Sequence, residues 1–435
     1  MSSSGSLITF ANTEIAIQRD RLVWLGDFYH TAPIIGTSTN RKDYSAGTLQ
    51  TFLNWQLPSG QLPLNTPIGY PGSATFTFAE YSKDLGYYYA LEDYHILGLL
   101  AFSSHMRYNN DIAFATKNWA QWKLAVQYLI GKIDKSTGLV TISFAFFGDG
   151  AGLAVNSASV QAFKELAVVA TALGDTSSAK AWSAVAAALS STIQSKFWQP
   201  SLGHFSDNPL NVTKLSVQGL SFVITSGIAS ASQARSCLDA LTALKLSPGY
   251  KDLTTTSSEG IVDISPNTNG FLLSALLQSN RTAEAKYLFD NLWAAMINND
   301  TTHSGASWEY VNTNLQPALS RYTSLSHPWG GAPTYIFTEY VAGIRPVTFG
   351  HQTWVISPAY TGFDLQSASA QVTTPYGVLS VKWSVANGKI NAVVNAPAGT
   401  SGTFVINRAL ANSTKSNTVV QIKGGILPKV LCLDL

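Results

Sequence analysis

The stretch LGDTSSAKAWSAVAAALSSTI, residues 173–193, decides the fold class of this chain. Its apolar side chains recur at helical spacing and share one helix face: Trp182, Val185, Ala186, Leu189 and Ile193. Before this face, Gly174 is suited to end one helix, and Thr176 or Ser177 to cap the next. The stretch therefore predicts a helical hairpin, made of a helix near residues 157–173, a short turn and a second helix.

Residues 45–342 repeat this pattern. Apolar positions at helical spacing follow the turn SNRTAE (279–284), and a further face lies earlier in the chain: Leu288, Leu292, Ala295 and Met296, and then Trp122, Val126 and Leu129. The turn SNRTAE is expected to cap the helix after it. Because no alternating strands separate these helices, the pattern predicts an array of helical hairpins, arranged as a bundle, a solenoid or a toroid.

After about residue 345, the spacing of apolar residues changes from a helical period to strand-like alternation. In GVLSVKWSVANGKINAVVNAPAGTSGTFVIN (377–407), apolar and polar residues alternate, so that Leu379, Val381 and Trp383 face away from Ser380, Lys382 and Ser384. The pair Asn387-Gly388 is a hairpin turn signal. We therefore predict two domains, a helical domain over 1–344 and a small antiparallel β-sandwich over 345–435.

Composition excludes several classes of partner. The chain has 435 residues, of which 46% are hydrophobic and 12% charged, with a net charge of +2 and no Lys/Arg cluster. We expect neither a nucleic acid nor a membrane as partner, because basic patches are absent and no apolar run reaches roughly 18–20 residues. With two cysteines, Cys237 and Cys432, far apart in the sequence, the chain could have one disulfide or none.

The chain is expected to be extracellular. It carries four Asn-x-Ser/Thr sequons in polar contexts, at Asn211, Asn280, Asn299 and Asn412. Its start, MSSSGSLITFANTE, lacks the basic beginning and apolar middle of a signal peptide. We therefore expect a secreted protein whose true N-terminus, with its signal peptide, is missing from this chain.

Strong cofactor motifs are missing from the sequence. It has no HExxH, paired CxxC, phosphate-binding loop, Gly-x-Ser-x-Gly or dinucleotide fingerprint, and its seven histidines are scattered. The sequence therefore gives little support to metal, nucleotide or serine-nucleophile chemistry, and no cofactor is expected.

Carboxylates beside aromatic residues offer a different chemistry. They occur in QRDRLVWLGD (18–27), GASWEYVN (305–312) and SLSHPWGG (324–331). Glycosidases need two carboxyl groups around the bond that they cleave, and tryptophan faces bind sugar rings. Each stretch also has a structural interpretation: Asp20 in a surface ion-pair loop, Glu309 at a helix start beside a buried indole, and His327 hydrogen-bonded in a loop.

Several motifs in order resemble those of one enzyme family. These are Arg19-Asp20 with Trp24-Leu25-Gly26-Asp27, FLLSALL (271–277), Trp293 with Met296, Trp308-Glu309, Ser324-Leu325-Ser326-His327, and the run PAYTGFDLQSASAQVTTPYGVLSVKW (358–383). Together they resemble the catalytic domain of the α-L-rhamnosidases of glycoside hydrolase family 78, in a fungal branch. The resemblance covers nearly the whole chain.

The resemblance implies an (α/α)₆ toroid of six helical hairpins followed by the β-sandwich. It also implies an inverting α-L-rhamnosidase that removes terminal rhamnose, with Asp20 as general acid and Glu309 as general base, roughly 6.5–9.5 Å apart. Substrate-binding roles fall on Arg19, Trp24, Asp27, Trp308 and His327. The mechanism needs no metal, and the partner is a carbohydrate.

The chain departs from the family pattern in two ways. Asp20 stands where many members have glutamate, and the chain begins sooner, so we expect a truncated or misassembled start, which could leave the toroid short of one helix. The alternatives are another (α/α)₆ glycosidase, a polysaccharide lyase or a degenerate sugar-binding protein. The lyase is disfavoured because few Lys/Arg lie near the proposed site; the short start and Asp20 favour the sugar-binding protein somewhat.

Overall fold

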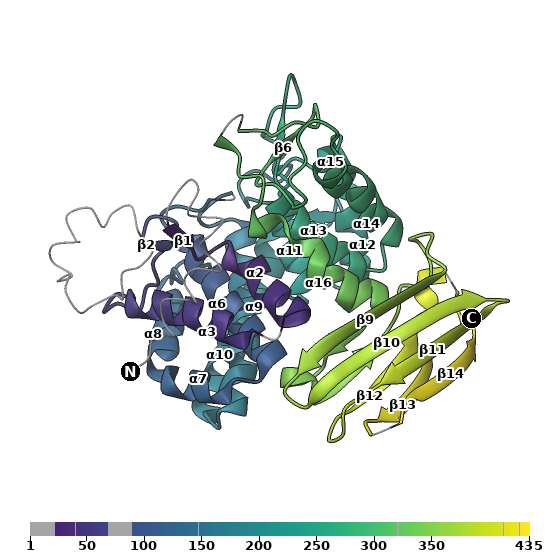
Figure 1. Ribbon diagram of the computed structural model, residues 1–435. Coiled ribbons are helices and arrows are strands. Elements are labelled where there is room, and N and C mark those ends of the chain that lie inside the picture. Colours follow the sequence, from purple (N-terminus) through teal and green to yellow (C-terminus); the bar gives the residue numbers. More distant parts are fainter. Residues whose placement is uncertain are drawn as a thin grey trace.

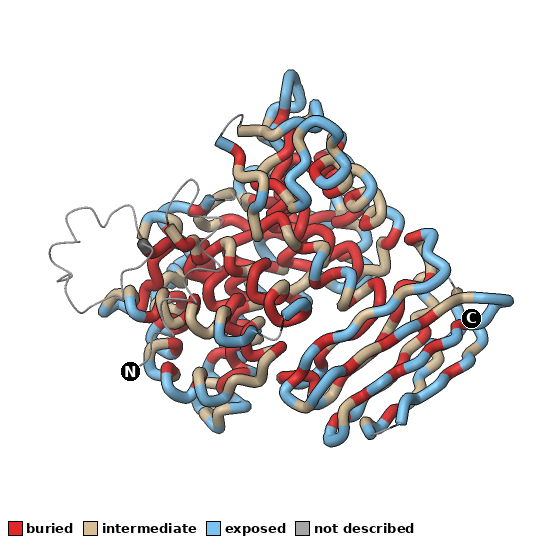
Figure 2. Tube along the Cα trace, viewed as in Figure 1, coloured by how far each residue is buried: buried red, intermediate tan, exposed pale blue. Residues whose placement is uncertain are grey.

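The structure is a computed structural model that describes residues 22–39, 41–67, 89–146, 148–319, 322–411, 413–425 and 427–435. A helical body and a β body lie side by side (Figure 1). Buried residues gather through the middle of the helical body and alternate with exposed residues along the strands (Figure 2).

Six helices of the described residues form a closed ring. They are α2 (Phe28–Ser38), α6 (Glu92–Asn109), α9 (Leu153–Ala172), α11 (Val217–Thr225), α13 (Pro266–Gln278) and α16 (Ala332–Ile336). Each contacts the next in this order, and α16 contacts α2. The closed ring confirms the (α/α)₆ toroid over the bundle and the solenoid.

A second layer of helices covers this ring from outside. Within the described ranges it consists of α3 (Lys42–Asn54), α7 (Ile112–Lys117), α8 (Trp119–Gly131), α10 (Thr176–Phe197), α12 (Ala231–Ala240), α14 (Thr282–Leu288) and α15 (Ala294–Ile297), with the π-helical turn Phe289–Trp293 between the last two. The longer outer helices turn one apolar face inward. On α10 that face is the predicted one, since Trp182, Ala186, Leu189 and Ile193 are all buried.

The turn between α9 and α10 corrects one detail of the sequence analysis. Gly174 adopts φ +77° and ends the first helix, as predicted. The cap of α10 is Asp175, whose carboxylate accepts the Ser178 N–H at 3.1 Å, so the prediction of Thr176 or Ser177 is wrong. The cap predicted in SNRTAE is also wrong: the turn there is made by Asn280 at φ +59°, and Arg281 precedes α14 without a side-chain cap.

The C-terminal body contains two four-stranded sheets. Its strands are β7 (Ile344–Pro346), β8 (Thr353–Ile356), β9 (Ser367–Thr374), β10 (Gly377–Ala386), β11 (Lys389–Asn395), β12 (Ser401–Ile406), β13 (Thr418–Lys423) and β14 (Lys429–Asp434). The sheet β14-β11-β10-β9 is antiparallel throughout. In β13-β12-β8-β7, however, β12 runs parallel to β8, so the antiparallel prediction is wrong for this one pair.

The predicted strand alternation and hairpin are confirmed. Leu379, Val381 and Trp383 of β10 are buried in the core of the sandwich. Asn387 and Gly388 both have positive φ and join Ala386 to its partner Lys389, which is the geometry of a two-residue hairpin loop. The boundary drawn between residues 344 and 345 falls within β7 and stays a prediction.

Three pairs of very short strands hold loops of the helical body. They are β1 (Leu22–Trp24) with β2 (Asn65–Pro67), β3 (Trp198–Gln199) with β4 (His204–Phe205), and β5 (Asp263–Ile264) with β6 (Val311–Asn312).

The two cysteines do not form a disulfide. Cys237 is buried and Cys432 is exposed, and both thiols are free.

Candidate active site

The predicted site residues gather where inner helices begin. Asp27 immediately precedes α2, Glu92 and Asp93 are the first residues of α6, and the turn Pro328–Gly330 leads into α16. The N-terminal end of a helix carries partial positive charge and stabilises a nearby carboxylate. This end of the ring therefore favours a set of acidic groups.

The stretch Val23–Asp27 is held in place by its own apolar residues. Trp24 pairs with Asn65 across β1 and β2, and the next residue, Leu25, is fully buried and donates its N–H to the Leu64 carbonyl at 2.8 Å. A Cβ at Gly26 would lie 2.6 Å from the ring of Tyr94, so only glycine fits there. These contacts fix the backbone that carries Asp27, immediately before the first residue of α2.

Asp27 meets His327 from the far end of the helical domain. The His327 Nε2 lies 3.4 Å from the Asp27 Oδ1, and each side chain is 13% exposed. The backbone N–H of His327 donates to the Ser307 carbonyl at 2.8 Å, and its ring packs on Trp329 with centroids 4.5 Å apart. The pair is thus fixed, with a small accessible surface on both partners.

Glu309 is held by the same loop as His327. Its backbone N–H donates to the Ser324 carbonyl at 2.9 Å, and its Oε2 accepts the Ser324 N–H at 3.1 Å. Its carbonyl accepts the Trp329 indole N–H at 2.8 Å. Glu309 is only 3% exposed, so its carboxylate has one well-defined orientation.

The pKa values of two buried tyrosines, Tyr94 and Tyr310, are raised by the charges of both Asp27 and Glu309. Burial raises the pKa of Tyr94, and the negative charges of Asp27, Asp93 and Glu309 raise it further. Burial also raises the pKa of Tyr310, with further contributions from Asp252, Glu309 and Asp27. Both phenols therefore stay protonated at neutral pH and can donate hydrogen bonds.

Two family models match the chain. Residues 343–421 match the bacterial alpha-L-rhamnosidase C-terminal domain, and residues 131–345 match the mannosylglycerate hydrolase MGH1-like glycoside hydrolase domain. A curated α-L-rhamnosidase of Formosa agariphila is 28% identical over 88 residues, which are 20% of this chain and 9% of that protein.

Two solved structures share the architecture over most of the chain. The family 78 rhamnosidase of Bacillus sp. GL1 has a TM-score of 0.69 at 19% identity, covering 89% of this chain and 39% of its own. The α-L-rhamnosidase from Aspergillus terreus has a TM-score of 0.70 at 17% identity, covering 99% of this chain and 48% of its own. The chain has the fold of the family 78 α-L-rhamnosidases. The resemblance predicted from the motifs is confirmed, and the chain spans less than half the length of these two enzymes.

Within this rhamnosidase-type glycoside hydrolase fold, the structure describes five of the seven predicted site residues. Trp24, Asp27, Glu309 and His327 line the same end of the ring. Trp308 is fully buried, so its ring lies in the protein core and not on a surface that a sugar could reach. Arg19 and Asp20 lie outside the described residues, and their roles and the spacing of Asp20 from Glu309 stay predictions.

The sequence analysis missed several residues around the candidate site. They are Asp93, Tyr94, Asp252, Tyr310 and Trp329. Burial raises the pKa of Asp252 to about 6, and its carboxylate accepts the Thr268 hydroxyl. Tyr310 and Trp329 stood inside the quoted stretches, where a search for aromatic neighbours of acids would have found them. Nothing in the sequence around Asp93, Tyr94 or Asp252 marks them.

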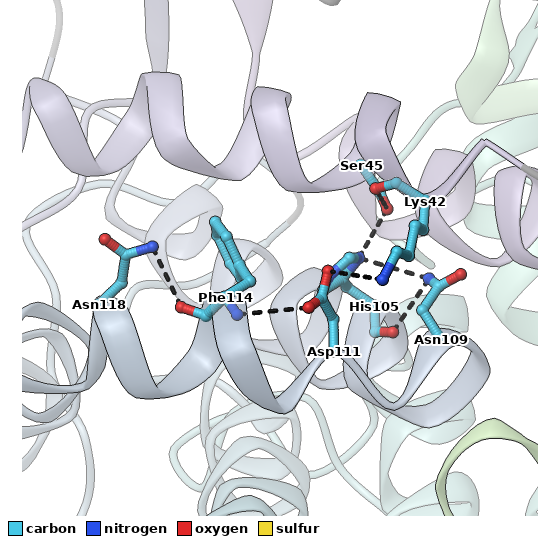
Figure 3. Close-up of polar contacts among 7 residues, drawn as sticks. All are labelled: Lys42, Ser45, His105, Asn109, Asp111, Phe114 and Asn118. Atoms are coloured by element: carbon cyan, nitrogen blue, oxygen red, sulfur yellow. Dashed lines mark hydrogen bonds and ion pairs between the residues drawn. The ribbon is translucent and has the colours of Figure 1, made fainter. Parts of the chain in front are cut away.

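A serine, a histidine and an aspartate also meet between the inner helix α6 and the outer helices α3 and α7, in a cluster that includes Lys42 and Asn109 (Figure 3). The Ser45 hydroxyl lies 2.6 Å from the His105 Nδ1, and the His105 Nε2 lies 3.6 Å from Asp111. Ser45 and His105 are both fully buried, so no substrate reaches the hydroxyl. The cluster joins α3, α6 and α7, and Asp111 caps α7 by accepting the Phe114 N–H. Its role is structural.

In the part of the chain that the structure describes, no three His, Cys, Asp or Glu side chains are grouped so as to hold a metal ion. None of its helices combines the length and apolar character needed to cross a bilayer.

Proposed function

We propose that this chain is the catalytic part of a glycoside hydrolase that removes terminal α-L-rhamnose from rhamnosides with inversion of configuration. The observation that carries the proposal is the convergence of Asp27, His327 and Glu309, with aromatic rings between them, at one end of a rhamnosidase-type ring. The substrate is a carbohydrate, and no metal takes part.

In the proposed reaction, Asp20 donates a proton to the glycosidic oxygen as the bond from that oxygen to the anomeric carbon breaks. Glu309 takes one proton from a water molecule, whose oxygen bonds to the anomeric carbon from the opposite face. The products are rhamnose of inverted configuration and the free alcohol. The N–H of Ser324 on Oε2 keeps the Glu309 carboxylate oriented for this step.

The remaining residues bind the sugar. Asp27 and His327 are close enough to hold neighbouring hydroxyls of one ring, since their polar atoms are 3.4 Å apart and both are partly exposed. Trp24 is half-buried and offers a ring face to the sugar, and Arg19 is assigned to substrate binding by the motif that it shares with Asp20.

The match to the MGH1-like domain over 131–345 favours one second candidate, another (α/α)₆ glycosidase with a different sugar in the same site. Release of 4-nitrophenol from the α-L-rhamnoside and from the α-mannoside separates the two. Cleavage of the rhamnoside supports our proposal, and cleavage of the mannoside alone supports the second candidate.

Two variants test the assigned roles. Glu309→Gln should lose about 10²–10⁴-fold in kcat on every rhamnoside, because each reaction needs activated water. In Asp20→Asn, kcat should fall by a much larger factor on methyl α-L-rhamnoside than on 4-nitrophenyl α-L-rhamnoside, because nitrophenolate leaves without a proton. Azide should partly restore turnover of Glu309→Gln, since it attacks without a base. Proton NMR should show β-rhamnose as the first product of the wild-type enzyme.

The matched control is Glu284→Gln on the outer helix α14, which pairs with Arg281 and should leave kcat unchanged. Equal losses of Asp20→Asn on both substrates would point to a binding role for Asp20. Full activity of Glu309→Gln would reject the mechanism, and α-rhamnose as the first product would reject inversion.

We also propose that the protein is secreted through a glycosylating route. The support is Asn211, an exposed sequon asparagine whose Oδ1 accepts the Thr213 hydroxyl. Asn280 and Asn299 are half-buried, and Asn412 lies outside the described residues.

A further inference from the structure

A pocket of about 330 Å³ lies between the helical body and the β body. One wall is the turn between α13 and α14, with Asn280 and Thr282. The other wall carries Arg345 of β7, Ser357 after β8 and Asn407 after β12. The volume lies within the range of small-molecule sites, which is about 300–1,000 Å³.

This pocket is separate from the candidate active site. The helix α13 begins at Pro266, which lies beside Gly330 of the turn that leads into α16 at the active-site end of the ring. The pocket lies at the other end of α13, beside Leu277. A helix of 13 residues is about 20 Å long, so one sugar unit cannot occupy both places.

Arg345 brings a positive charge to this pocket. Its Nη1 donates to the Glu339 carbonyl at 2.7 Å, and its guanidinium lies 4.8 Å from the centroid of the Tyr340 ring. The Glu339 carboxylate pairs instead with Arg107 at 3.2 Å and accepts the Tyr108 hydroxyl. Within the described ranges, no Asp or Glu lines the pocket or forms an ion pair with Arg345. The charge of Arg345 is therefore available to an anionic ligand.

Neutral polar groups surround this charge. The Asn407 Nδ2 donates to the Asn280 Oδ1 at 2.7 Å, which links the two bodies and fixes both amides at the pocket wall. The hydroxyls of Thr282 and Ser357 form no hydrogen bond with another described residue. These groups can bond to the hydroxyls of a ligand.

The end of α13 does not oppose an anion here. The C-terminal end of a helix carries about half a negative charge, which resides on its last carbonyls. The Arg281 N–H donates to the Leu276 carbonyl at 2.8 Å, and the Asn280 N–H donates to the Leu277 carbonyl at 3.2 Å. Because the turn itself satisfies these carbonyls, the full charge of Arg345 outweighs them.

We propose that this pocket binds a sugar acid, a carbohydrate unit that carries a carboxylate. The carboxylate lies on the Nε and Nη2 of Arg345, which form a fork that matches its two oxygens. The ring hydroxyls bond to Asn280, Thr282 and Ser357, and Leu410 offers apolar surface to the C–H groups of the ring. A phosphate or sulfate ion would leave most of this volume unfilled. The proposal does not depend on the function proposed above.

The test compares D-glucuronate with D-glucose, which differ only in the carboxylate at C6. The full chain is produced in a bacterial host, so that the sequon residue Asn280 carries no glycan, and Kd is measured by saturation-transfer NMR. The wild type should bind glucuronate at least about 10-fold more tightly than glucose, the usual effect of one charged hydrogen bond. Arg345→Met should weaken glucuronate binding about 10–100-fold and leave glucose binding unchanged.

Two further variants keep the test independent of folding. Thr282→Val has nearly the same shape as the wild type but lacks the hydroxyl, and it should weaken the binding of both sugars about 5-fold. The matched control is Arg235→Met, because Arg235 is exposed on the outer helix α12, away from the pocket, and this variant should change neither Kd.

Competition separates this pocket from the catalytic end. Glucuronate that stays bound in excess L-rhamnose supports the proposal even if no rhamnoside is cleaved, whereas displacement by rhamnose would overturn it. Inorganic phosphate that binds as tightly as glucuronate would reduce the pocket to an anion site and also overturn it. Equal binding of glucuronate and glucose, or undiminished glucuronate binding in both Arg345→Met and Thr282→Val, would refute the assignment.

Discussion

His95 should make the stability of this protein fall in mild acid. The side chain is 1% exposed on α6. The Leu62 N–H donates to its Nδ1 at 3.0 Å, and its Nε2 lies 3.0 Å from the Ala125 carbonyl. A backbone N–H can only donate, so Nδ1 carries no proton and His95 is neutral. A second proton, on Nδ1, would place the Nδ1–H of His95 against the N–H of Leu62, and that hydrogen bond would be lost.

Burial lowers the pKa of His95 to about 4, while its bond to Ala125 acts weakly in the opposite direction. In the unfolded chain the pKa is about 6.5. Because the unfolded state binds the proton first, the contribution of His95 is complete above pH 6.5 and is lost as the pH falls toward 4. At pH 5 the two pKa values give a loss of about 2 kcal/mol relative to pH 7.5.

The assay is urea unfolding of the wild type and of His95→Gln at pH 7.5 and pH 5. Glutamine offers an acceptor for Leu62 and a donor for Ala125 but does not titrate in this range. Between the two pH values the wild type should lose about 2 kcal/mol more than the variant. If both lose the same free energy of unfolding, the burial argument for His95 is wrong.

Three further predictions follow from single contacts. Trp122→Ala should lower the free energy of unfolding by about 3–5 kcal/mol in urea, because Trp122 is fully buried and stacked on Phe102 at 4.0 Å. His327→Asn should lower kcat/KM for 4-nitrophenyl α-L-rhamnoside about 10–100-fold with an unchanged circular dichroism spectrum, the usual effect of losing a charged hydrogen bond; unchanged kcat/KM would remove His327 from the site. In a glycosylating host, Asn211→Gln should reduce the secreted mass by one glycan, whereas Asn299→Gln should not, because the Asn299 amide already donates to the Leu315 carbonyl; the reverse pattern would contradict this assignment.

The helices could be predicted because their apolar faces are encoded locally. The spacing of Trp182, Ala186, Leu189 and Ile193 needs no partner to be recognised. The choice of cap is finer, since it depends on where the chain leaves the left-handed conformation of Gly174, and this shifted the cap to Asp175. The parallel pairing of β8 with β12 joins distant segments, and strand alternation carries no information about direction.

The candidate site divides in the same way. Asp27, Glu309 and His327 were found because short motifs surround them. Tyr94 was missed because it resembles any apolar residue of a buried helix, and only the tertiary contact with Gly26 and Trp24 brings its ring to the site. Motifs identify residues whose neighbours in sequence share their role, and they miss residues that the ring alone brings together.

The contact of α16 with α2 joins the two ends of the helical domain, so the ring can close only after the last inner helix has been synthesised. This order of synthesis has a consequence for the quality control of the nascent chain. Asp27 emerges from the ribosome 300 residues before His327. Until the last inner helix is synthesised, α2 and α13 each lack a neighbour and expose apolar surface of the kind that chaperones bind. Because contacts of such long range form late, the proposed activity would begin only when the ring is complete, and an interrupted nascent chain would be both inactive and recognisable as unfinished.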